Sequence, residues 1–416
     1  MSVETDPSKP SWVIRLAAVT VLVGIGGGIS GLAVTFLLRS IQHLAYGYSE
    51  GTFLAGLTES SPWRRVLALL IAGLIGGIGW WAIRRWGAPV VSIVDGVAGQ
   101  RMPVLTTILN SSLQIVIVAL GASIGREEAP RELGALIASR ISEKVGLSPR
   151  EQRILVACGA GAGLAAVYNV PLGGALFAVE ILLAELSFAT ILPALATSAI
   201  ATLVTHLFIS TSPLYRLPQY SLSASLLVWS VVVGPLIGLA AVGFVWLGST
   251  AKVHRPRGWR IIVVMPAVFL VIGLVSISYP AILGNGRSLG QIAFDATLPL
   301  GMIALLLLLK AAATVSTIGS GAAGGLLTPS LAIGASLGAV SGVLWVALWP
   351  GPHVAAFAFI GAAAFLASSM RAPMTALVLV VEFTNQGPAI LAPTMLAIAG
   401  SVSVGYLIGK RRFTFA

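Results

Sequence analysis

Two glycine-rich segments of the chain could bind an anion through their backbone. They are "GASIGREEAP" (121–130) and "GAAGGLLTPS" (321–330), and in each a glycine turn leads into an expected helix. The N-terminus of a helix carries unpaired N–H groups and the positive end of the helix dipole, so it attracts an anion without a full charge. The predicted anion ligands are the backbone amides of Arg126, Glu127, Leu326 and Leu327.

Glu127 brings a carboxylate to the place that an anion would occupy at the first of these helix ends. Such a carboxylate competes with the permeating anion, and protonating it or swinging it away frees the position. The alternative is a structural ion pair with Arg126 or Arg131. Ionisable groups at membrane depth are functional by default, which favours a gate that could also carry a proton. Glu128 is expected to lie in a water-facing turn.

The sequence offers weaker support for metal or hydrolytic chemistry. The four histidines are scattered and only one cysteine is present, so no metal site and no cofactor are expected. "GASIG" (121–125) and "GASLG" (334–338) match G-x-S-x-G, and a membrane-embedded serine hydrolase using Ser123 or Ser336 is the alternative function. That motif requires a strand–turn–helix setting with histidine and acid partners. We therefore predict a protein that is not an enzyme and has no catalytic residues.

The elements around these segments are expected to be membrane helices. The chain is 57% hydrophobic and only 9% charged over 416 residues. A helix crosses a bilayer with about 20 mainly apolar residues. Apolar stretches of that kind occupy 12–38, 64–83, 221–248, 261–283 and 297–317, with further apolar sequence at 154–208 and 326–408. The predicted fold class is an all-α polytopic membrane protein.

The net charge of +11 is concentrated in short basic clusters beside apolar segments, such as Arg84–Arg85 and Lys410–Arg412. This clustering is typical of cytoplasmic edges rather than of nucleic-acid binding. It predicts a multi-pass protein of the cell membrane with both termini cytoplasmic and residues 209–220 outside. The first apolar stretch is expected to be retained, because no small-residue cleavage site follows it. Lys310 is expected to extend its ammonium group to the membrane surface.

The sequence contains an internal repeat. "GAGAGLAAVYNVPLGGALFAVE" (159–180) matches "GAAAFLASSMRAPMTALVLVVE" (361–382) at an offset of 202, including a proline and a glutamate. The two segments quoted first match at an offset of 200. Paired glycine and proline interruptions are typical of transporters built from repeats, with the site at the repeat interface. The predicted organisation is a tail (1–11), a first repeat (12–208), a linker (209–220) and a second repeat (221–416).

These motifs resemble those of the CLC family of chloride channels and proton/chloride antiporters. "GREEAPRELG" resembles the family's GREGP segment, "GGLLTPSLAIG" resembles its GxFxP segment, and the likeness runs from about residue 12 to the end. The resemblance implies a homodimer with one anion pathway per subunit, each subunit being formed from two inverted repeats whose broken helices meet at a central site. It implies that Glu127 is the external gating glutamate, that the Leu326 and Leu327 amides line the central site, and that the protein lies in a bacterial inner membrane.

The chain also departs from the family pattern. "GAPVVS" (87–92) stands in place of the family's GSGIP loop, so Pro89, with Val90 after it, falls at the serine that binds the central anion. Members with proline there favour nitrate over chloride. Phe413 falls at the position of the central tyrosine and lacks its hydroxyl. Ile181 replaces the inner proton-transfer glutamate, so the inner proton relay is either missing or rerouted, with Glu180 and Glu185 as the candidate residues.

Overall fold

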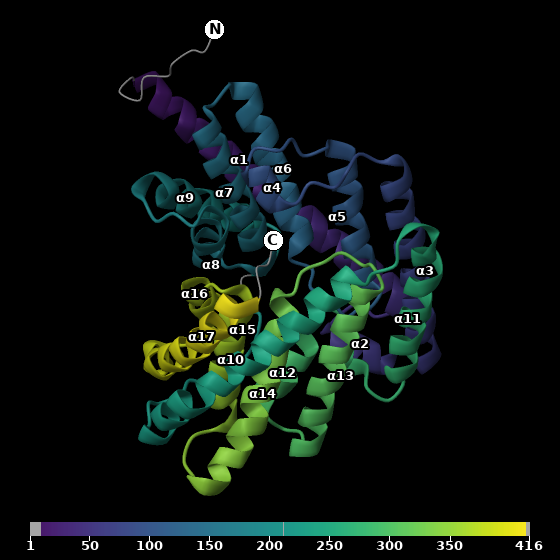
Figure 1. Cartoon of the computed structure of the whole chain (residues 1–416), viewed down its shortest axis with the longest axis vertical. Helices are drawn as coiled ribbons and strands as arrows, with labels where there is room; N and C mark the ends of the chain where they lie inside the picture. Colours follow the sequence, from purple (N-terminus) through teal and green to yellow (C-terminus); the bar gives the residue numbers. More distant parts are fainter. Residues whose placement is uncertain (1–9, 211, 413–416) are drawn as a thin grey trace. The chain divides into compact units, whose positions relative to one another are not determined.

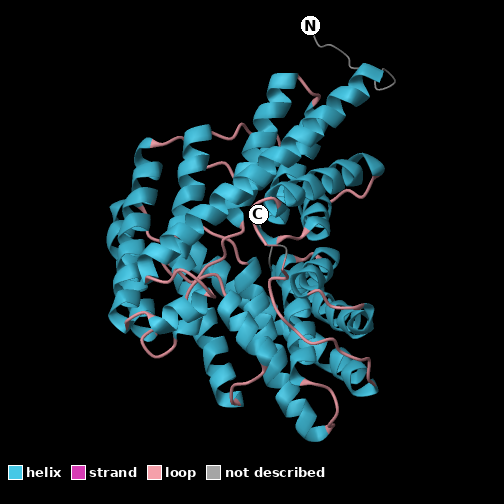
Figure 2. Ribbon diagram, turned by 180° about the vertical axis from the view of Figure 1, so that it is seen from behind, coloured by secondary structure: helices cyan, strands magenta, loops and turns pink. Residues whose placement is uncertain are grey.

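The computed structural model describes residues 10–210 and 212–412. Within them the chain forms helices joined by loops, and no described segment forms a β-strand (Figure 2). Eight of the described helices are long and apolar enough to cross a membrane. These observations confirm the predicted all-α, multi-pass class of fold.

The chain divides into two compact units, and the division falls within helices α1 and α5. Unit 1 comprises the described residues of Met1–Phe36, Gly87–Ser112 and Glu127–Ser212. Its elements are the first part of α1 (Pro10–Tyr46), α4 (Ile93–Val97), the first part of α5 (Val104–Ala119), α6 (Glu128–Val145), α7 (Pro149–Tyr168), α8 (Pro171–Leu176), the π-helix η1 (Phe177–Leu183) and α9 (Phe188–His206).

Unit 2 comprises the described residues of Leu37–Trp86, Leu113–Arg126 and Pro213–Ala416. Besides the remainders of α1 and α5, its α-helices are α2 (Phe53–Glu59), α3 (Pro62–Trp86), α10 (Ala224–Val253), α11 (Ile261–Val275), α12 (Arg287–Asp295), α13 (Leu300–Gly319), α14 (Leu327–Leu348), α15 (Val354–Met370), α16 (Pro373–Thr384) and α17 (Leu391–Arg412). Short 3₁₀ turns occur at η2 (Gly258–Arg260), η3 (Pro280–Ile282) and η4 (Pro388–Ile390).

In unit 1, glycines allow α6 and α7 to pack backbone against backbone (Figure 1). A Cβ added at Gly134 would collide with the carbonyl oxygen of Gly159, and one added at Gly159 would collide with that of Gly134. Small residues let helix backbones approach in this way. α7 starts at a capping box in which Ser148 and Glu151 bind each other's backbone N–H groups, which fixes where this helix begins.

Unit 2 repeats this arrangement with α14 and α15. A Cβ added at Gly334 would lie 2.7 Å from the Gly361 carbonyl oxygen, and one added at Gly361 would lie 2.6 Å from that of Gly334. These glycines follow those of the α6–α7 contact at the offsets of 200 and 202 residues found in the sequence. The local structure therefore recurs together with the repeated sequence.

The helix ends recur in the same way. α7 ends at Asn169 and α15 ends at Arg371, with positive φ angles of 58° and 53°. Left-handed residues are common where helices stop. In each case a proline, Pro171 or Pro373, then opens the next helix. The break predicted in each repeat is therefore present, and the apolar stretches 154–208 and 326–408 are each divided into several helices.

Tyr215 holds residues 213–220, the part of the expected linker that belongs to unit 2. The Tyr215 side chain is fully buried, its ring contacts those of Phe294 and Phe383 edge-on, and its backbone N–H donates to the Phe383 carbonyl at 2.9 Å. Beside it, Gln291 hydrogen-bonds both the N–H and the carbonyl of Arg216 at 3.0 Å. Residues 213–220 are therefore held in place by apolar side-chain contacts and by hydrogen bonds to the backbone.

Candidate functional site

Glu127 lies at the start of α6, in the N-cap position, and its side chain is completely buried. The carboxylate oxygen Oε2 accepts a hydrogen bond from the phenol of Tyr168, with an O–O distance of 3.3 Å. Tyr168 is the last residue of α7 and is itself only 4% exposed. The packing of α6 on α7 therefore brings a carboxylate and a phenol together at the end of a helix whose N–H groups suit an anion.

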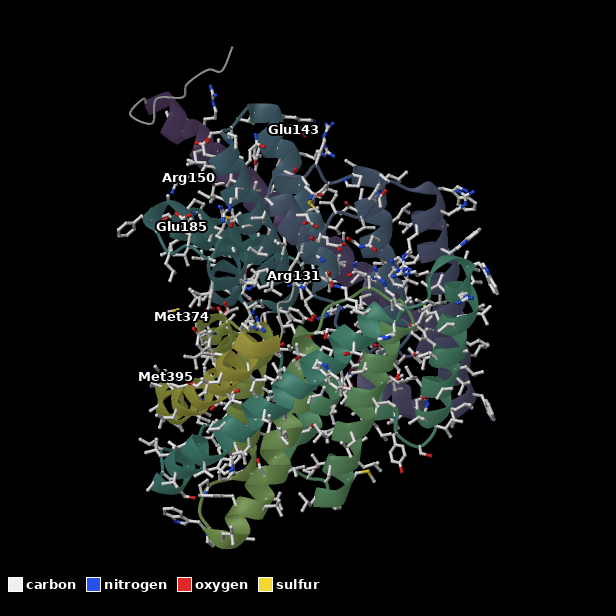
Figure 3. All side chains as sticks on the ribbon, viewed as in Figure 1. Arg131, Glu143, Arg150, Glu185, Met374 and Met395 are labelled. Carbon is white, nitrogen blue, oxygen red and sulfur yellow. The ribbon has the colours of Figure 1, made fainter. Side chains whose placement is uncertain are left out.

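Arg131 binds the backbone of Glu127. Its Nε donates to the Glu127 carbonyl oxygen at 3.0 Å, one helical turn back. Its guanidinium carbon lies 4.8 Å from the centre of the Phe177 ring, a cation–π arrangement. Arg131, labelled in Figure 3, therefore holds the main chain at the start of α6, and an ion pair of Glu127 with Arg126 or Arg131 stays an alternative.

A second buried carboxylate lies five residues further along α6. Glu132 is 4% exposed and accepts hydrogen bonds from Asn110 at 3.0 Å to each oxygen and from the Ser111 hydroxyl at 2.8 Å. Sequence reasoning missed this residue because it belongs to the charged run "REEAPRE". A spacing of five from Glu127 is the only signal in the sequence that sets it apart.

The second predicted helix end is the start of α14. Leu326 is its N-cap and Leu327 is its first residue, so the helix begins where the glycine turn predicted it. Pro329 lies in its first turn, where no backbone N–H is needed. Gly324 has a φ of +158°, and Gly321 a φ of +97° that a side chain would not tolerate readily. A Cβ at Gly324 would also lie only 3.1 Å from the Gly125 carbonyl oxygen.

Within unit 2, the two equivalent glycines of the repeat pair with each other. The Gly125 N–H donates to the Gly325 carbonyl at 2.7 Å, and the Gly325 N–H donates to the Gly125 carbonyl at 3.1 Å. This reciprocal antiparallel pair immediately precedes Arg126 in one repeat and Leu326 in the other. Both candidate helix ends thus follow one shared backbone anchor.

Lys310 does not reach the membrane surface, so that expectation is wrong. The side chain is completely buried in unit 2. Its ammonium group donates to the Ser123 hydroxyl at 2.8 Å and to the carbonyls of Ile282 at 3.0 Å and Gly284 at 2.7 Å. The three N–H donors of the ammonium group are therefore all satisfied, by one acceptor from the loop at Ser123 and two from the loop at 282–284. A lysine side chain can be buried when its donors are satisfied in this way. Lys310 therefore supports the loop that leads to Glu127.

The remaining predicted site residues lie elsewhere in the fold. Pro89 and Val90 are exposed in the segment that leads to Ser92, which caps α4 by accepting from the Asp95 N–H at 3.1 Å. Phe413 lies outside the described residues. The role of all three in binding an anion stays a prediction.

The two candidate relay residues lie at and beyond the π-helix. Glu180 is half-buried within η1, whose wider turn follows α8 directly. Glu185 forms an ion pair with Arg150 at 3.1 Å and accepts from the Ser187 hydroxyl at 3.1 Å, and Arg150 and Glu185 lie side by side in Figure 3. No direct link between these carboxylates and Glu127 is found among the described contacts, so a relay through them stays a prediction.

The hydrolase motif lacks its structural setting. Ser336 lies within α14, where its hydroxyl donates to the Ala332 carbonyl at 2.8 Å. Ser123 is in a turn after α5 and contacts Lys310 and Thr314. The strand that should precede such a serine is not found in residues 10–210 or 212–412. The same residues contain no group of three or more His, Cys, Asp or Glu side chains that could hold a metal.

Known proteins similar to this chain are anion channels and transporters by name. A ClcB-like chloride channel protein of Ralstonia nicotianae is 31% identical over 412 residues, which cover 93% of each chain. The voltage-gated ClC-type chloride channel ClcB of Citrobacter koseri is 29% identical over 90% of this chain and 92% of its own. Nothing in these similarities supports the serine hydrolase alternative.

Solved structures share the fold. A slow cyanobacterial Cl⁻/H⁺ antiporter superposes with a TM-score of 0.84 at 20% identity over 95% of both chains. A CLC-type fluoride/proton antiporter superposes with a TM-score of 0.76 at 22% identity over 97% of both chains. The family model described as voltage gated chloride channel matches residues 75–406. The chain therefore belongs to the voltage-gated chloride channel family, the CLC proteins.

Proposed function

We propose that this protein transports small inorganic anions, chloride or nitrate, across a bacterial inner membrane, and that Glu127 is its gate. The observation that carries the proposal is the completely buried carboxylate at the start of α6. A buried negative charge at a helix N-terminus occupies the position that the same N–H groups would offer to a permeating anion. The Arg126, Glu127, Leu326 and Leu327 amides are the proposed ligands.

The proposed gating step is a competition between two anions for one set of donors. While ionised, Glu127 is stabilised by the helix end and by the Tyr168 phenol, and it excludes the permeating ion. Protonation removes the charge that these donors stabilise, so the side chain leaves and the anion enters. No full positive charge is required at the site, which lets the anion depart again.

The transport mode is proton-coupled antiport or passive conduction, and the names of similar proteins include both. Antiport would need a second proton acceptor, for which Glu180 and Glu185 are the candidates. Glu185 forms an ion pair with Arg150, and Ile181 cannot carry a proton. Pro89 and Val90, as the proposed equivalents of the family's anion-binding loop, and Phe413 would set the preference between chloride and nitrate. We also propose a homodimer with one pathway per subunit.

The test is an ion-flux assay in liposomes loaded with chloride or nitrate, with external pH recorded. Wild type is expected to conduct either anion at a rate that rises as pH falls. Glu127→Gln, which mimics the protonated gate, is expected to give a rate independent of pH. Glu128→Gln is the matched control, because it removes the neighbouring carboxylate, which is only half-buried, and is expected to behave as wild type.

Two outcomes would count against parts of this proposal. Wild-type protein that is folded but gives no anion flux would overturn anion transport. A Glu127→Gln variant with an unchanged pH profile would remove the gate and leave transport intact. Uphill proton movement driven by an anion gradient identifies antiport, and its absence identifies conduction.

A further inference from the structure

Three contacts in unit 1 connect Glu127 with its neighbours. Tyr168 donates to its carboxylate, Arg131 donates to its carbonyl, and the Arg131 guanidinium lies over the Phe177 ring. The four residues come from α6, α7 and η1; two of the contacts hold Glu127 itself, one at its side chain and one at its backbone, and the third holds Arg131. We call Glu127, Arg131, Tyr168 and Phe177 the gate cluster.

The internal repeat distinguishes the gate cluster from the scaffold around it. Both repeats keep the glycines of the helix contacts, the left-handed residues Asn169 and Arg371, and the prolines that follow them. At the four gate-cluster positions the repeats differ. The residues at the same offsets in the second repeat are Leu327, Leu331, Met370 and Leu379.

All four positions differ between the repeats in the same sense: the first repeat has charged or aromatic residues where the second has aliphatic ones. Packing alone is satisfied by leucine and methionine at the same places in α14, α15 and α16, so it does not require an arginine, a tyrosine and a phenylalanine around Glu127. The phenol and the guanidinium occur where a carboxylate is present and are missing where it is replaced by leucine. This co-occurrence is the pattern expected of residues that act on the carboxylate.

We propose that Tyr168 is a positioning residue for the gate, acting through its hydrogen bond to Glu127, while Arg131 and Phe177 fix the backbone from which that carboxylate projects. The phenol that donates to the Glu127 carboxylate stabilises the seated position of this side chain, which has to be left before the anion can enter. Tyr168 therefore sets how acidic the solution must be before the gate opens. This inference rests on the proposed transport function.

The charged groups close to Glu127 in the sequence are the same in wild type and in a Tyr168 variant. Arg126 precedes it in the chain, and α6 also carries Glu128, Arg131 and Glu132. α4, which also packs against α6, carries Asp95, but the pocket that α4 lines includes Ser139 and Glu143, toward the other end of α6. None of these changes when the Tyr168 hydroxyl alone is removed, so a single-atom substitution isolates its contribution.

The experiment compares Tyr168→Phe with wild type in the liposome assay across pH. Because the hydrogen bond is long, the pH of half-maximal flux is expected to rise by about half a unit, or roughly threefold in proton concentration. Tyr48→Phe is the matched control: its phenol donates to Gln42 over the same 3.3 Å, away from the gate cluster. It is expected to leave the profile unchanged.

The Glu127→Gln background separates positioning from a purely structural role. If Tyr168 acts through the carboxylate, adding Tyr168→Phe to Glu127→Gln has no further effect on flux. An equal effect in both backgrounds, or an unchanged midpoint in the single variant, overturns this inference while transport stands. Absence of flux from folded wild type overturns the proposed function itself. If Tyr168→Phe yields no folded protein, Tyr168→Met, which copies Met370, provides the same comparison.

Discussion

A single buried ammonium group stabilises the loop before the gate. Lys310 has no carboxylate partner in the described part of the chain, yet its three donors meet Ser123, Ile282 and Gly284. Removing one member of a buried polar network leaves the others without partners and costs more than the network contributed. Lys310 is therefore a sensitive point for the stability of unit 2, even though it is not part of the proposed anion site.

Lys310→Met keeps the length of the side chain and removes the charge and all three donors. We expect a loss of stability of about 1–3 kcal/mol, because two buried carbonyls lose their partner. The measurement is the fraction of protein in detergent that remains monodisperse after heating. Lys252→Met, which removes an exposed lysine at the end of α10, is the control and should melt as wild type does. Equal melting of Lys310→Met and wild type would contradict this role.

At the scale of helices, close backbone contact holds the gate in place. α6 carries Glu127 and Arg131, α7 carries Tyr168, and the reciprocal contact of Gly134 with Gly159 sets the distance between the two helices. Interiors are close-packed, so an added methyl group has to push the helices apart. The distance from Tyr168 to Glu127 would increase with them.

Gly134→Ala is expected to destabilise the protein by about 1–3 kcal/mol through overpacking and to shift the gate's pH profile in the same direction as Tyr168→Phe. Gly243→Ala on α10 is the control, because a Cβ there has no atom within 4 Å. Alanine in an open helical position should be neutral or slightly stabilising. Heating in detergent and liposome flux are measured for both. A Gly134→Ala variant indistinguishable from Gly243→Ala would contradict the close-contact argument.

At the scale of the whole molecule, the basic clusters predict which loops face the cytoplasm. Lys252 lies in the last turn of α10 and Arg255 and Arg257 follow it, whereas the segment 209–220 before α10 carries only one basic residue. The positive-inside rule places the first on the cytoplasmic side and the second outside. Cys158 is the single cysteine and is completely buried. Labelling of a variant with an introduced cysteine therefore reports the side of the membrane on which that cysteine lies, without a background from Cys158.

Ser212→Cys in intact cells is expected to react with a membrane-impermeant maleimide, because Ser212 is exposed in the predicted outer segment. Lys252→Cys is expected to react only after the cells are permeabilised. Wild type is the control for Cys158 and should remain unlabelled under both conditions. Labelling of Lys252→Cys in intact cells, with Ser212→Cys protected, would reverse the predicted orientation.

The sequence predicted the elements and the gate carboxylate more readily than the groups that act on it. The long apolar stretches became α1, α3, α10, α11 and α13 because length and composition suffice for a membrane helix. Glu127 could be identified because charge is rare in this chain. Tyr168 could not be identified in this way, because in "AAVYNVP" it looks like one more apolar residue of a membrane helix. Only the comparison with Met370, its equivalent in the second repeat, distinguishes it. The burial of Lys310 depends on carbonyls from the loop at 282–284, which no local pattern indicates.

The paired glycines Gly125 and Gly325 bear on how such a chain could have arisen. In this antiparallel bridge the equivalent residues of the two repeats each donate to and accept from the other, an arrangement that is compatible with a self-complementary, two-fold contact. A contact of that kind can form between two copies of the same protein. Two copies of a half-length protein, inserted into the membrane in opposite directions, could have formed it as an ancestral dimer. Fusion of the two genes would then have preserved the Gly125–Gly325 contact and allowed each copy to diverge. One copy would have acquired the carboxylate of Glu127, and the other would have kept Leu327 at the equivalent position.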